Sequence, residues 1–168
     1  MPEIAMQWQH FEELSRGRLY QLLRFRQDIF VVEQRSPYPD LDGLDQRAWH
    51  LAARSGDELI GYLRVVPAEG PAGQVRIGRV AVSPRARRRG IGRVAVSARA
   101  RRQGIGGMLM REALSFCRHR YPGQPIGLGA QLQLAVFYRS FGFAVVSDPY
   151  DDFGVAHIDM VLRPADQA

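Results

Sequence analysis

The chain has 168 residues, of which 46% are hydrophobic and 24% charged, a balance typical of a soluble globular protein. No apolar run approaches the roughly 18–20 residues of a membrane span, and the acidic, polar start does not fit a signal peptide. The net charge is +6, but ten of the 23 basic residues lie between Arg76 and Arg102, and all 23 are arginine. The complete absence of lysine indicates a compositional bias and argues against a nucleic-acid-binding protein, which would normally use both residue types.

The only cysteine, Cys117, excludes a disulfide framework and favours a reducing compartment, so we expect a cytoplasmic protein with no membrane partner. Its place in an apolar helical stripe predicts a packing role for this thiol rather than a nucleophilic one. The length suits one domain, which we assign to residues 1–168.

The first half of the chain predicts a helix followed by three strands. Ser15 is placed to cap a helix over residues 16–29, and a Pro-, Asp- and Gly-containing loop follows at 31–45. Strands are predicted at 48–54, 58–66 and 74–82, separated by short turns that make an antiparallel meander.

The second half predicts a helix, a strand, a short helix and two closing strands. Apolar residues at helical spacing mark 107–120 and 132–140, and β-type runs mark 125–130, 142–148 and 157–162. The sequence therefore predicts an α/β fold of the α+β type, with a mixed, largely antiparallel sheet flanked by helices.

A tandem repeat interrupts this order. Residues 77–90 (the first segment) and 91–104 (the second segment) follow each other without a gap and are identical at 12 of 14 positions. Each contains a strand-like run, a basic turn and the beginning of a glycine-rich loop. A fold normally has one place for such a unit, so the two segments compete for it.

The glycine-rich stretch RRQGIGG, residues 101–107, precedes a helix. Glycines let backbone amides approach an anion, and the positive end of the helix dipole favours a phosphate there. The predicted ligands for that phosphate are Arg101, Arg102, Gln103, Gly104, Ile105, Gly106 and Gly107. No metal site is expected, since the chain lacks a His/Cys cluster.

The stretch V-x-V-S-x-x-x-R-x-x-G-x-G-G and the later GAQLQLAVFYRSFGF, residues 129–143, resemble the two signatures of the GNAT N-acetyltransferase superfamily. FVVEQRSPYPDLDGLD, LGAQ and the residues from Tyr150 to Ile158 resemble its small ElaA-type branch. The resemblance covers nearly the whole chain apart from the extra 14 residues. It implies direct acetyl transfer from acetyl-CoA to a primary amine of a small molecule or peptide.

Both segments contain R-x-x-G-x-G, but only the second leads into an amphipathic helix, so we assign the phosphate loop to the second segment. We also favour the second segment for the central strand, which places Val94, Ala95 and Val96 against the pantetheine arm. The alternative is a central strand from the first segment, which follows the preceding hairpin more directly. A tolerated genetic accident or an engineered change would explain the repeat without any function.

The resemblance implies that Tyr138 is the acid that protonates the leaving thiolate. Glu33 is the candidate base, since it follows an apolar run and we expect it to be partly desolvated. His50 and His157 are alternative bases, although a hydrogen-bonded core role is favoured for both. Asp40, Asp42 and Asp45 lack Ca²⁺-loop spacing, which leaves turn capping or an acidic acceptor pocket.

Other functions remain as alternatives. An acyl-homoserine-lactone-synthase-like acyltransferase would share the fold, and a catalytically impaired acyl-CoA binder would result if the repeat spoils the site. A homodimer that pairs through an extruded strand is a further candidate assembly.

Overall fold

A computed structural model describes residues 3–70, 73–88 and 104–164 of the chain. The strands are Ile4–His10 (β1), Trp49–Ser55 (β2), Glu58–Val66 (β3), Val75–Val82 (β4), Ile126–Gln131 (β5), Ala144–Val145 (β6), Tyr150–Asp152 (β7) and Val155–Leu162 (β8). The α-helices are Arg16–Gln27 (α1), Pro84–Arg88 (α2), Ile105–Arg120 (α4) and Ala135–Arg139 (α5). Shorter helical turns are Phe11–Glu13 (η1), the π-helical Asp28–Glu33 (η2), Asp45–Arg47 (η3) and Leu132–Leu134 (η4).

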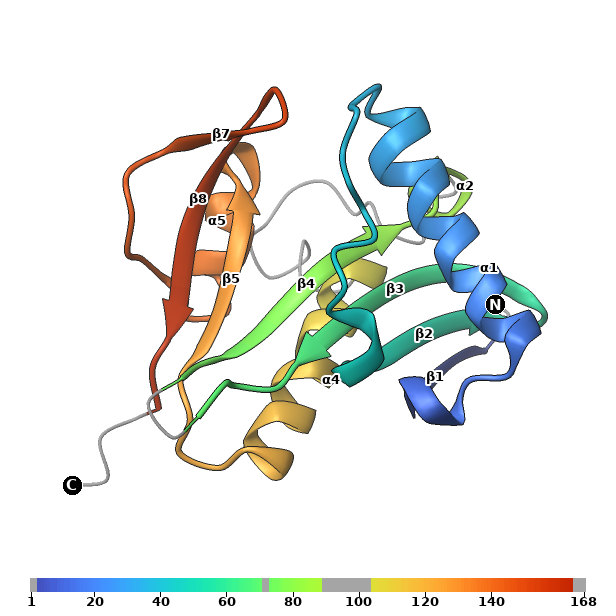
Figure 1. The fold of residues 1–168 in the computed structure, drawn as a ribbon, viewed down its shortest axis with the longest axis horizontal. Helices are drawn as coiled ribbons and strands as arrows, with labels where there is room; N and C mark the ends of the chain where they lie inside the picture. Colours follow the sequence, from blue (N-terminus) through green and yellow to red (C-terminus); the bar gives the residue numbers. More distant parts are fainter. Residues whose placement is uncertain (1–2, 71–72, 89–103, 165–168) are drawn as a thin grey trace.

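The strands form one sheet in the order β1-β2-β3-β4-β5-β8-β6, with β7 paired to β8. Every neighbouring pair is antiparallel except β4 and β5, which are parallel. The predicted α/β class with a mixed, largely antiparallel sheet is therefore confirmed. Figure 1 shows α1 in front of β2 and β3, with α4 behind the sheet.

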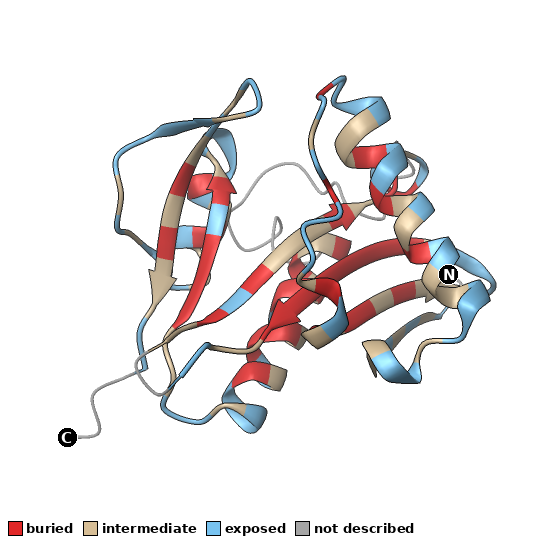
Figure 2. Ribbon diagram, in the orientation of Figure 1, coloured by how far each residue is buried: buried red, intermediate tan, exposed pale blue. Residues whose placement is uncertain are grey.

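The apolar core lies between the sheet and the helices α4 and α5. Helix α4 buries Leu109, Met110 and Ala113 completely, because its apolar residues recur at helical spacing. Figure 2 shows the buried stretches concentrated on β2, β3, β5 and α4. The beginning of α4 packs tightly on β3, since a Cβ on Gly61 would lie 2.8 Å from Ile105 Cγ2.

Most of the predicted elements are present at or near their expected bounds. Ser15 caps α1 by accepting a hydrogen bond from the Arg18 amide at 3.2 Å, and β3 has its predicted ends. Two strands were missed, β1 and β7. The alternation of Ile4, Met6 and Trp8 toward α4 is the signal that would have identified β1.

The central strand corrects one expectation. Strand β4 comes from the first segment, with Ile77–Val82 paired to β3, although we favoured the second segment for this position. The continuous β3–β4 hairpin explains the result, because Val75 and Ile77, at the beginning of β4, are buried in the core. Val94, Ala95 and Val96 lie outside the described residues.

Candidate functional site

The sheet opens where its two parallel strands separate. Strand β4 pairs with β5 only at Val75–Ile126 and Arg76–Gly127, although both strands continue well beyond these positions. Figure 1 shows the two strands side by side at their beginnings and diverging toward their ends. The end of β4 therefore keeps its pairing with β3 on one side, while the backbone on its β5 side has no sheet partner among the described residues.

A β-bulge lies within this free stretch of β4. Arg64 of β3 is opposite Gly78, and Tyr62 is opposite Ala81, so β4 has one extra residue between these pairs. Arg79, in the bulge, has a φ of 56°, in the left-handed region that non-glycine residues seldom adopt. The bulge changes the direction of Val80, Ala81 and Val82 relative to the first half of the strand.

The end of β4 meets the beginning of α4. A Cβ on Gly106 would lie 3.9 Å from Val82 Cγ2 and 3.8 Å from Phe137 Cζ. The strand end from the first segment, the helix that follows the second segment and helix α5 thus converge at Gly106. Because Gly106 has no side chain, the first turn of α4 comes close to the end of β4 and to α5.

The first turn of α4 has the features predicted for an anion site. Gly104 is its N-cap residue and has no side chain with which to cap the free amides of Ile105, Gly106 and Gly107. These amides and the helix dipole favour a negative charge. Arg101, Arg102 and Gln103, the other predicted phosphate ligands, lie outside the described residues.

Glu33 lies at the end of η2, and its carboxylate accepts a hydrogen bond from Arg87 Nη2 at 2.5 Å. The same arginine, in α2, donates from Nε to the backbone carbonyl of Val82 at 3.0 Å. Glu33 is therefore held beside the end of β4 by the arginine of the first segment's own loop motif. Its side chain is 37% exposed.

Tyr138 lies in α5 and is 6% exposed, packed edge-on against Phe137 and Phe143. Burial raises the pKa of its phenol to about 12, so the hydroxyl stays protonated at neutral pH. Phe137 in turn lies next to Gly106. Glu33 is thus connected to the end of β4 through Arg87, and Tyr138 packs on Phe137, which lies beside the first turn of α4.

A cluster of three arginines and three aspartates, four of them buried, lies on the α1 side of the sheet. Its aspartates are Asp40, Asp42 and Asp45, from the loop that follows η2. Its arginines come from three elements: Arg26 from α1, Arg64 from β3 and Arg79 from β4. The sequence reasoning missed these arginines, because residues far apart in the chain form the cluster.

Each aspartate of the cluster contacts at least one guanidinium. Arg26 donates to Asp40 Oδ2 at 2.9 Å and to Asp45 Oδ1 at 2.7 Å, and Arg64 donates to both Asp42 and Asp45. Asp42 also accepts a bond from the Leu44 amide at 3.1 Å, which is the predicted turn capping. The carboxylates are neutralised by these arginines, so this loop does not provide the acidic acceptor pocket that we considered.

The electrostatics of the cluster follow from this pairing. Burial alone would raise the pKa of Asp42, but hydrogen bonds and charge from Arg64 outweigh it and lower the pKa to about 2. The pKa of Asp45 is lowered in the same way: burial opposes the shift, and bonds from Arg26 and Arg64 outweigh it. Asp42 and Asp45 are therefore ionised at neutral pH.

The two histidines have hydrogen-bonded structural positions. His50 is buried, its Nε2–H donates to the Asp45 carbonyl at 3.0 Å, and its Nδ1 accepts from Tyr62 Oη at 2.7 Å. Burial lowers the pKa of His50, which keeps the ring neutral. His157 Nδ1 donates to the Val155 carbonyl at 2.8 Å, and its ring stacks on Tyr150.

Cys117 is buried in α4, where burial raises the pKa of its thiol to about 12, so the predicted packing role is confirmed. In the part of the chain that the structure describes, no three His, Cys, Asp or Glu side chains are grouped to hold a metal ion. None of the helices in this part is long and apolar enough to cross a bilayer.

Comparison with known proteins defines the class of this fold and site. A model of the acetyltransferase (GNAT) family matches residues 18–98, and one of the acetyltransferase (GNAT) domain matches residues 91–164. Protein ElaA of Escherichia coli K12 is 38% identical over 159 residues, which cover 92% of this chain and 95% of ElaA. The chain belongs to the GNAT acetyltransferase family.

Two solved structures support this assignment at similar identity. The acyl-CoA N-acyltransferase from Pseudomonas aeruginosa is 34% identical, with a TM-score of 0.82 over 95% of this chain and 99% of that one. The crystal structure of Escherichia coli ElaA is 37% identical, with a TM-score of 0.79 over the same shares. This chain is thus similar to the ElaA proteins within the family.

Two more distant structures share the fold alone. A GNAT acetyltransferase from Elizabethkingia anophelis, solved with acetyl-CoA bound, has a TM-score of 0.59 at 14% identity. A CoA-dependent acyl-homoserine lactone synthase, solved with S-adenosylmethionine and isopentyl-CoA, has a TM-score of 0.70 at 17% identity.

Proposed function

We propose that residues 1–168 form one domain that transfers an acetyl group from acetyl-CoA directly to a primary amine. The observation that carries the proposal is the separation of β4 from β5 after Arg76–Gly127, with the open first turn of α4 at the end of β4. An acyl-CoA needs both parts: free strand amides for its pantetheine arm and a phosphate site for its pyrophosphate. The distant relative solved with acetyl-CoA supports the choice of cosubstrate.

In this proposal the backbone of Val80, Ala81 and Val82 takes the role that we first gave to Val94, Ala95 and Val96. The change follows from the position of the first segment in β4. The amides of the residues from Gly104 to Gly107 bind the pyrophosphate, with Arg101, Arg102 and Gln103 as further ligands. The phosphate site therefore stays with the second segment, and the strand site moves to the first.

Direct transfer needs an acid for the departing thiolate and a base for the amine. Tyr138, protonated at neutral pH, is the proposed acid: its hydroxyl gives a proton to the thiolate sulfur as the C–S bond breaks. Glu33 is the proposed base, and it receives the amine proton directly or through water. The new amide forms as the amine nitrogen attacks the thioester carbonyl.

Calorimetric titration of the full chain with acetyl-CoA tests the proposal first, and an amine screen that detects the released CoA thiol with a disulfide reagent follows. The only protein thiol, Cys117, is buried, which keeps the background of that assay low. Binding at one site per chain together with thiol release for an amine supports the proposal. Binding without turnover would identify the impaired binder, and turnover with S-adenosylmethionine as acceptor would identify the lactone-synthase alternative.

A further inference from the structure

Arg79 connects the strand proposed to bind the cosubstrate with the aspartate-bearing loop that follows η2. We propose that Arg79 is a positioning residue that couples β4 to residues 36–45, so that an acyl-CoA bound along β4 orders this loop. The inference rests on the proposed function, because it assigns the cosubstrate to β4.

Within the described part of the chain, the side-chain contacts of Arg79 go to this loop. Its Nε donates to Asp40 Oδ1 at 2.8 Å, and its Nη2 donates to the Asp40 carbonyl at 3.0 Å and to Asp42 Oδ2 at 3.1 Å. The Tyr38 ring covers the same guanidinium, with 4.7 Å between the ring centroid and Cζ. The side chain is only 12% exposed, so these interactions are well protected from solvent.

The other two arginines of the cluster hold the loop to different parts of the fold. Arg26 connects Asp40 and Asp45 to α1, and Arg64 connects Asp42 and Asp45 to β3. Arg79 lies in β4, and it is the member of the cluster that attaches the loop to this strand. Loss of its side chain should therefore uncouple the loop from β4 and leave it attached to α1 and β3.

The backbone conformation of Arg79 explains how CoA binding at the end of β4 would affect residues 36–45. Its left-handed conformation in the bulge immediately precedes Val80–Val82, whose backbone has no sheet partner on the β5 side in the described structure. A pantetheine arm bound there would restrict the backbone next to Arg79, and the guanidinium would pass this restriction to Asp40 and Asp42. Binding that rigidifies one element favours order in an element coupled to it, and the coupling is reciprocal.

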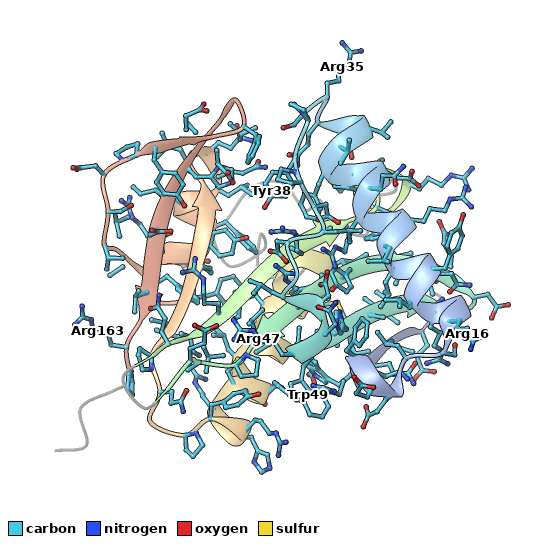
Figure 3. All side chains as sticks on the ribbon, in the orientation of Figure 1. Arg16, Arg35, Tyr38, Arg47, Trp49 and Arg163 are labelled. Carbon is cyan, nitrogen blue, oxygen red and sulfur yellow. The ribbon has the colours of Figure 1, made fainter. Side chains whose placement is uncertain are left out.

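The loop spans the opening between the two halves of the sheet. At its beginning the Ser36 hydroxyl donates to the Phe153 carbonyl, in the β7–β8 turn, at 3.0 Å. At its centre Tyr38 packs edge-on against the Phe153 ring at 5.8 Å. Figure 3 shows Tyr38 between α1 and the β5–β8 half. Order in this loop would therefore shape the side from which an acceptor approaches.

Hydrogen exchange of the full chain with and without CoA tests the coupling. The readouts are peptides that cover residues 36–45 and a β4 peptide that includes Val75, which distinguishes the first segment from the second. CoA should slow exchange of both peptides in the wild-type protein. The same is expected in Arg24→Gln, a control that breaks the exposed Arg24–Asp28 pair of α1.

In Arg79→Gln, CoA should still bind within a few-fold of wild-type affinity and still protect β4, but its protection of residues 36–45 should fall at least tenfold. Arg79→Lys keeps the charge but not the forked contacts, so it should show the same loss of loop protection. It replaces the glutamine variant if that variant is unstable. Equal CoA-induced protection of the loop in wild type and in either variant would overturn the inference, as would CoA binding to wild type without any loop protection. Absence of CoA binding to wild type would instead reject the proposed function, and the inference with it.

Discussion

Val82 at the end of β4 lies beside Gly106 in the first turn of α4, although the end of the first segment and all of the second separate them in the chain. The contact joins β4, which comes from the first segment, to α4, which follows the second segment. The extra residues therefore lengthen the connection between strand and helix, and the two elements still meet. The proposed acyl-CoA site depends on this meeting.

Gly106→Ala tests the first turn of α4 as the phosphate site. The new methyl group would make ordinary contacts with Val82 and Phe137, so the fold should accept it, and alanine favours a helix by about 0.5–1 kcal/mol. We expect unchanged or higher thermal stability together with at least tenfold weaker CoA binding in calorimetry. Gly17→Ala, at the same position of α1 with open space around it, is the matched control. CoA affinity equal in all three proteins would reject the assignment.

Matched substitutions test which segment forms β4. Ala81 is 3% exposed in β4, and its counterpart in the second segment is Ala95. Ala81→Asp should cost about 3 kcal/mol or more of unfolding free energy, because it buries a carboxylate beside the apolar core. Ala95→Asp should cost less than about 0.5 kcal/mol if the second segment does not take the strand position. Equal losses in denaturant titrations would mean that both segments occupy the strand position.

Deletion of residues 91–104 tests whether the second segment is needed for the site. The shortened chain keeps β4 and α2 and joins Gly90 directly to Ile105, which restores R-x-x-G-x-G-G after a single strand. We expect a folded protein that binds CoA at least as tightly as the full chain, because a shorter connection restricts the loop more. A folded deletion protein that no longer binds CoA would show that the second segment contributes essential ligands.

Tyr138→Phe tests the proposed general acid. Removal of the hydroxyl should leave CoA affinity within a few-fold and lower kcat by about 10²–10⁴, the usual contribution of acid–base catalysis. Phe137→Leu, a neighbouring aromatic change in the same helix, controls for packing. A kcat for Tyr138→Phe within threefold of wild type would remove this tyrosine from the mechanism.

The aspartate cluster predicts the acid stability of the fold. The pKa of Asp42 is about 2 in the folded protein, below the ordinary value of about 3.9 that an unfolded chain would have. Its carboxylate therefore stabilises the fold fully above about pH 4, and this contribution is lost as the pH falls toward 2. Asp42→Asn should be less stable at pH 7, and its unfolding free energy should change less between pH 4 and pH 2. Denaturant titrations at several pH values measure both, and an unchanged pH slope would contradict the prediction.

Much of the fold could be predicted from local patterns. Alternating and helical spacings located β2, β3, β4, α1 and α4, because the side-chain periods of strands and helices are properties of short stretches of chain. The same reasoning missed β1, although Ile4, Met6 and Trp8 alternate. Strand β7 has only three residues, Tyr150–Asp152, which is too short for a periodic signal.

The sequence by itself determined the family, the α/β class, the glycine-rich entry to α4 and the buried position of Cys117, since each depends on residues close together in the chain. Only the tertiary structure decided which segment forms β4, because the two are nearly identical and differ mainly in what precedes and follows them. It also decided the partners of Asp40, Asp42 and Asp45. Arg26, Arg64 and Arg79 come from a helix and two strands that meet only when the sheet and α1 are packed together.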